Sequence, residues 1–181
     1  MAVVEFIQRC LDQNYHSFVY CLEDLTSQEL SWRPNSHSMS IGFIAWHCCR
    51  IKDMWILERC MDVPQLWEES WAGRMGRLPA DHLDNGSRFT EEQLEDFQVP
   101  PLPMLLDYAK EANDKAVEYL QSINDDTLDN TVIMALRGEI GLSTMFQQII
   151  WEFNQHGGQM AYLKGMQRGM QPNTYTGGVL P

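Results

Sequence analysis

Basic residues are scarce in this sequence, since 13 lysines and arginines stand against 25 aspartates and glutamates, a net charge of -12. A surface this acidic repels phosphate backbones, so the composition argues against nucleic acid as a partner. No stretch approaches the roughly 20 apolar residues that a membrane span requires. The first residues also lack the basic segment and apolar segment of a signal peptide. We therefore expect a cytoplasmic protein that binds neither nucleic acid nor a membrane.

Several common catalytic motifs are missing as well. The sequence has no CxxC pair, no Gly-rich phosphate loop, no GxSxG turn and no HExxH helix. Its five cysteines are odd in number, which favours reduced and mostly buried thiols. Cys48 and Cys49 follow His47 directly, but neighbours along a helix do not face each other. No positively charged setting that would lower a thiol pKa is visible, so covalent cysteine catalysis is disfavoured.

Hydrophobic residues recur at three- and four-residue steps in four long segments, which predicts four helices. Their ranges are 2–24, 40–61, 103–122 and 143–167. Ser40 and Ser143 are placed to cap the second and fourth helices. No segment alternates apolar and polar residues in a way that demands a β-sheet, and residues 128–142 are interpreted as a linker.

The second and third helices are joined by a long irregular connection at residues 62–101, which is rich in glycine and proline. Connections of this length are usually functional or packed as a layer of their own. The expected fold is an all-α four-helix bundle formed by residues 1–170, followed by a flexible tail at residues 171–181.

Three polar residues lie on otherwise apolar helix faces. Glu152 and His156 are four residues apart and project from one side of the fourth helix, while His47 sits within the apolar stripe of the second. A buried carboxylate is costly unless it is paired or bound to a metal ion. Taken alone, His47 is typical of a hydrogen-bonded core histidine, and isolated ExxxH pairs occur by chance. Together, the three residues make a divalent-metal site a candidate beside that simpler interpretation.

Two parts of the sequence resemble motifs of a known family. The chain resembles DinB-like proteins at the entry to their second helix, in residues 30–34 (LSWRP) and 40–47 (SIGFIAWH). It also resembles the fourth-helix motif of these proteins, in residues 152–160 (EFNQHGGQM). The resemblance covers nearly the whole chain and implies a four-helix bundle, commonly a homodimer. It also implies a metal site with one histidine from the second helix and two from an HxxxH pattern on the fourth.

The resemblance assigns His47 and His156 to that metal site, whereas Glu152 stands where the family has its remaining histidine. A carboxylate also binds divalent ions, so zinc or nickel is expected, with iron or manganese as alternatives. Some relatives use low-molecular-weight thiols, which makes a metal-dependent, small-thiol S-transferase the expected function. The ion would lower the pKa of a bound thiol or water. A metal-assisted hydrolase remains an alternative, as does a non-catalytic bundle whose three polar residues form a core hydrogen-bond network.

Aromatic residues near these motifs are assigned to a pocket and to an interface. Trp46, Trp55 and Trp151, together with the long connection, are expected to shape a pocket for a small-molecule substrate. Phe43 and Trp46 lie off the inner stripe of the second helix. We therefore expect them to contribute exposed apolar surface to the homodimer.

Overall fold

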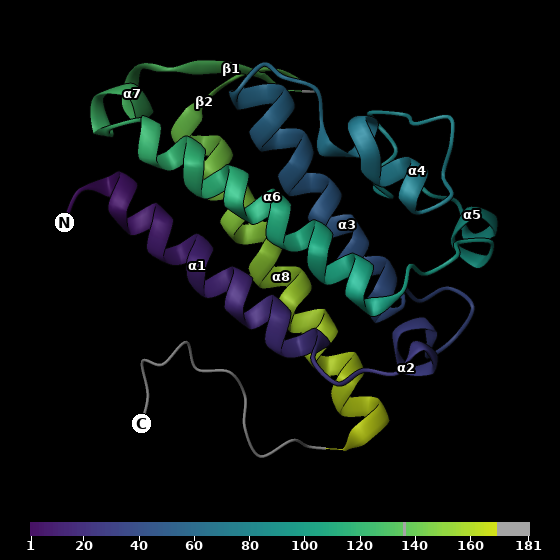
Figure 1. Ribbon diagram of the computed structural model, residues 1–181. Helices are drawn as coiled ribbons and strands as arrows, with labels where there is room; N and C mark the ends of the chain where they lie inside the picture. The colour runs from purple at the N-terminus through teal and green to yellow at the C-terminus, as the bar shows by residue number, and fades with distance from the viewer. Residues whose placement is uncertain (136, 170–181) are drawn as a thin grey trace.

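The computed structural model describes residues 1–135 and 137–169, and the tail expected at residues 171–181 lies outside this part of the chain. Four long helices pack side by side within it (Figure 1). They are α1 (Val3–Leu22), α3 (Ile41–Asp53), α6 (Leu102–Ser122) and α8 (Leu142–Arg168). The prediction of an all-α four-helix bundle is confirmed. Among the described residues, no helix is long and apolar enough to cross a membrane.

Each of the four helices contributes an apolar face to one core. α8 packs against α1 and α3, and α6 packs against the same two helices. Leu11 of α1, Ile44 of α3, Leu105 of α6 and Ile149 of α8 are at most 1% exposed. Burying such a side chain contributes about 1.5–3 kcal/mol to folding. The three- and four-residue spacing seen in the sequence therefore corresponds to the faces that meet in the bundle.

Side-chain caps start several helices, and the cap predicted at Ser40 is among them. Thr26 forms a capping box at the start of α2 (Ser27–Ser31). Ser40 Oγ accepts a hydrogen bond from Phe43 N at 3.1 Å and so caps α3. The prediction for Ser143 is wrong, because α8 begins one residue earlier and Ser143 lies inside its first turn. Beyond its last α-helical residue, α3 continues into η1, a π-helical segment at Met54–Cys60.

The long connection packs as a layer against α3 (Figure 1). Its helical elements are η2 (Trp67–Trp71), α4 (Ala72–Arg74) and α5 (Glu91–Glu95). Phe43 and Trp46 lie beneath this layer and are 3% and 0% exposed. Their rings meet Phe97 of the connection at centroid distances of 5.0 and 4.9 Å. The expectation that they form exposed dimer surface is therefore wrong, because the connection covers them.

The interpretation of residues 128–142 as a linker is also corrected. They include the end of α7 (Asp125–Asn130) and a hairpin of two strands, β1 (Val132–Ala135) and β2 (Gly138–Gly141). The strands pair antiparallel, with Ile133 opposite Ile140. Strands of four residues, one of them beginning and ending in glycine, carry too little alternation to be seen in the sequence.

Candidate metal centre

The three polar residues selected from the sequence come together between α3 and α8. One donor atom from each of His47, Glu152 and His156 lies within 4.8 Å of the other two. The two imidazole rings are 4.9 Å apart between centroids, at an interplanar angle of 82°. His156 Nε2 lies 3.2 Å from Glu152 Oε2. Two ligands of a tetrahedral ion are about 3.4 Å apart, so modest side-chain movements would suffice to surround one.

Helix geometry and packing explain this convergence. Glu152 and His156 are separated by about one turn of α8, and α3 packs along the same side of that helix. His47 and His156 are 8% and 9% exposed, whereas the Glu152 side chain is 24% exposed. The site therefore lies at the edge of the core, with its carboxylate side open to solvent.

The ring of His47 is oriented by the long connection. Its Nδ1 is hydrogen-bonded to the carbonyl oxygen of Asn85. A carbonyl can only accept, so Nδ1 carries the proton and Nε2 keeps a free lone pair. Burial lowers the pKa of His47, and the neighbouring His156 lowers it further, although the bond to Asn85 opposes this. The ring is thereby favoured in the neutral form that metals bind.

His156 lies between two hydrogen-bond acceptors. Its Nδ1 is 2.8 Å from Gln159 Oε1, and its Nε2 faces Glu152. Burial alone lowers the pKa of His156, but the hydrogen bonds to Glu152 and Gln159 outweigh it and the pKa is raised. The bond from His156 in turn lowers the pKa of Glu152, whose other oxygen accepts from Gln148 Nε2 at 3.3 Å. An ion binding at Nε2 would displace the proton held there.

A sequence model of the DinB superfamily matches residues 11–160, which include all three of these residues. The chain belongs to the DinB superfamily. The crystal structure of a conserved protein from Enterococcus faecalis is similar to it, with a TM-score of 0.78 and 22% sequence identity. That match covers 94% of this chain and 99% of the other and shows a shared fold. No curated protein sequence matches the chain.

The other residues proposed for the DinB-superfamily site are less favourably placed. Trp46 is 0% exposed inside the aromatic core, so it reaches no open pocket, while Trp151 is 54% exposed and Trp55 is half-buried. Cys48 and Cys49 are buried. Burial raises the pKa of Cys49 to about 12 and that of Cys48 well above its usual value. Both thiols therefore stay protonated near neutral pH, in line with the expectation of unreactive, buried cysteines.

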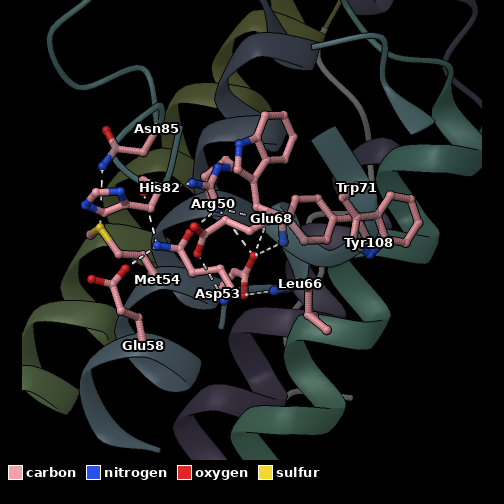
Figure 2. A network of polar contacts seen from close by, with 12 residues as sticks. Arg50, Asp53, Met54, Glu58, Leu66, Glu68, Trp71, His82, Asn85 and Tyr108 are labelled. Atoms are coloured by element: carbon pink, nitrogen blue, oxygen red, sulfur yellow. Dashed lines mark hydrogen bonds and ion pairs between the residues drawn. The ribbon is translucent and has the colours of Figure 1, made fainter. Parts of the chain in front are cut away.

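Sequence reasoning missed a buried polar network beside the site, drawn in Figure 2. Asp53 is 0% exposed and accepts hydrogen bonds from the backbone N–H groups of Leu66 and Trp67, both at 2.9 Å. It also accepts from the Tyr108 hydroxyl at 2.6 Å and faces Arg50 Nη1 at 3.3 Å. The carboxylate thus joins the start of η2 to α3. The sequence held one signal of this network. Charged residues lie close together at the end of α3, a helix otherwise apolar enough to be buried on all sides.

Proposed function

We propose that this DinB-superfamily protein binds a divalent metal ion through His47, Glu152 and His156 and acts as a metal-dependent enzyme on a small molecule. The observation that carries the proposal is the convergence of three donor groups from two helices within 4.8 Å. Hydrogen bonds at both Nδ1 atoms make the two Nε2 atoms the ring nitrogens for an ion, which would displace the proton that His156 Nε2 shares with Glu152. Two imidazoles and one carboxylate suit zinc or nickel, and also iron or manganese.

Low-molecular-weight thiol transfer is the leading chemistry, and metal-assisted hydrolysis is the alternative. When bound, the ion would lower the pKa of a thiol or a water molecule that reached it. The Glu152 side chain is 24% exposed, so a small molecule would approach the ion from that side. The Glu152 carboxylate would cancel one positive charge, and the buried ring of His47 would exclude water from the opposite side.

A non-catalytic core network is the competing interpretation. It accounts for the ion pair between Glu152 and His156 without any ligand. It accounts equally for the bond from His47 Nδ1 to the Asn85 carbonyl, so metal binding has to be measured to separate the two interpretations.

Metal analysis of protein purified without a histidine tag separates these interpretations. Wild type should retain about one ion per chain. His156→Ala should lose it, because only His47 and Glu152 would remain as ligands. Glu152→His should retain or tighten it, most for zinc and nickel, since imidazole replaces carboxylate on the same helical face. His82→Ala is the matched control, because that side chain is half exposed and outside the site.

Circular dichroism should show that every variant is folded. A folded wild type without useful metal affinity would refute the proposal, as would His156→Ala that binds as tightly as wild type. In either case the core-network interpretation stands. For metal-loaded protein, activity toward thiols with an electrophile supports transfer, and activity toward esters or amides supports hydrolysis.

A further inference from the structure

Arg50 links α3 to the part of the long connection that ends at Asn85 (Figure 2). Its Nε donates to the carbonyl of Asp84 at 2.8 Å, and its Nη2 donates to the carbonyl of His82 at 3.1 Å. Asn85 follows directly, and its own carbonyl accepts from His47 Nδ1. One helix therefore supplies both the histidine and the side chain that holds the histidine's acceptor in place.

The guanidinium of Arg50 is itself held on its remaining side. Nη1 donates to Gln65 Oε1 at 2.7 Å and to the Tyr108 hydroxyl at 3.2 Å, and it faces Asp53 at 3.3 Å. The group also lies 4.6 Å from the centroid of the Trp67 ring and is 0% exposed. A planar guanidinium with partners on every nitrogen has one orientation, so its two bonds to the connection have a defined direction.

The backbone after Asn85 is constrained from the other side. Gly86 has φ +84°, a conformation that favours glycine. A Cβ at this position would lie 2.8 Å from Phe43 Cζ and 3.0 Å from Trp46 Cζ3. The chain therefore passes close against the aromatic rings of α3. Arg50 anchors the backbone before Asn85, and the glycine permits its path afterwards.

We propose that Arg50 is a positioning residue for the metal centre: by holding the carbonyls of His82 and Asp84 it aims the Asn85 carbonyl at His47 and fixes the tautomer that presents Nε2. The metal part of this inference rests on the proposed function, whereas the tautomer of His47 is a property of the protein alone. Removing a partner that orients a metal-binding histidine typically lowers metal affinity about 10–100-fold.

Two variants break the link at different points. Arg50→Lys keeps a positive charge opposite Asp53, but an ammonium group cannot reproduce the fork that spans two carbonyls. Gly86→Ala leaves the Arg50 side chain and its hydrogen-bonding groups intact. The added methyl group displaces the backbone next to the Asn85 carbonyl. Tyr108→Phe is the matched control, because Gln65 and Asp53 still hold Nη1 when the hydroxyl is removed, and both bonds from Arg50 to the connection stay in place.

The readouts are the ¹⁵N shifts of the His47 ring in metal-free protein and the affinity for zinc. Wild type should show one Nδ1–H tautomer. Arg50→Lys and Gly86→Ala should each show a mixture with the Nε2–H form and a 10–100-fold weaker zinc affinity, while Tyr108→Phe should change affinity by no more than about twofold.

An unchanged His47 tautomer in folded Arg50→Lys and Gly86→Ala would overturn the inference. A loss of zinc affinity in Tyr108→Phe as large as in the other two variants would overturn it as well, because the network would then act through stability alone. If Arg50→Lys does not fold, Gly86→Ala decides. If wild type binds no zinc, the proposed function fails, and the ¹⁵N shifts still decide whether Arg50 positions His47.

Discussion

Replacing Lys52 with methionine should remove a large part of the pH dependence of stability above neutrality. Lys52 is 2% exposed in the bundle core, where its Nζ donates to Asn113 Oδ1 at 2.9 Å and lies 4.3 Å from the centroid of the Phe153 ring. Burial lowers its pKa from 10.5 to about 8, although Cys49, Cys48 and Asp12 oppose this. In the folded protein, Lys52 therefore loses its proton at a lower pH than in the unfolded chain.

The sign and size of the effect follow from proton linkage. Between pH 8 and pH 10.5 the unfolded chain binds more protons at Lys52 than the folded protein, so the free energy of unfolding rises with pH. At about 1.4 kcal/mol per pH unit, the full gain is about 3 kcal/mol, most of it reached by pH 10. At pH 7 the Lys52→Met variant avoids the buried charge but leaves Asn113 without its partner, which costs about 1–3 kcal/mol.

Urea unfolding under reducing conditions at pH 7 and pH 10 measures this directly. Between pH 7 and pH 10, wild type should gain about 2–3 kcal/mol of unfolding free energy relative to Lys52→Met. The control is Lys110→Met, whose lysine is 65% exposed; its difference should stay within about 0.5 kcal/mol. An equal wild-type-to-Lys52→Met difference at both pH values would refute the reasoning.

Three further predictions concern stability and assembly. Asp53→Ala should lower the free energy of unfolding by about 3–5 kcal/mol, because it leaves the Arg50 charge unpaired in the core; a change below about 1 kcal/mol in urea would contradict this. Gly158→Ala should add up to about 1 kcal/mol, since its Cβ would meet nothing within 4 Å, and calorimetry showing a lower Tm would count against it. We still predict a homodimer, now through exposed α8 residues such as Trp151 and Tyr162. Light scattering should show a dimer that Tyr162→Glu converts to a monomer, and a monomeric wild type would refute the prediction.

Local sequence was sufficient for the features that depend on one helix at a time. The 3.6-residue period determines which face of each long helix is apolar, and Ser40 can cap α3 without help from distant residues. The placement of Glu152 and His156 on one face of α8 follows from their spacing alone. The resemblance of residues 30–34, 40–47 and 152–160 to DinB-like motifs then identified the family.

The remaining features required the tertiary structure, because they depend on how distant segments pack. All 13 residues of α3 are buried, since the bundle covers one side and the long connection covers the other. Arg50 and Asp53, three residues apart, look in the sequence like an ordinary exposed ion pair and become a buried network only under that layer. The same layer brings the Asn85 carbonyl to His47, across 38 residues of sequence. Periodicity specifies which way a side chain leaves its own helix, whereas the connection decides what it meets there.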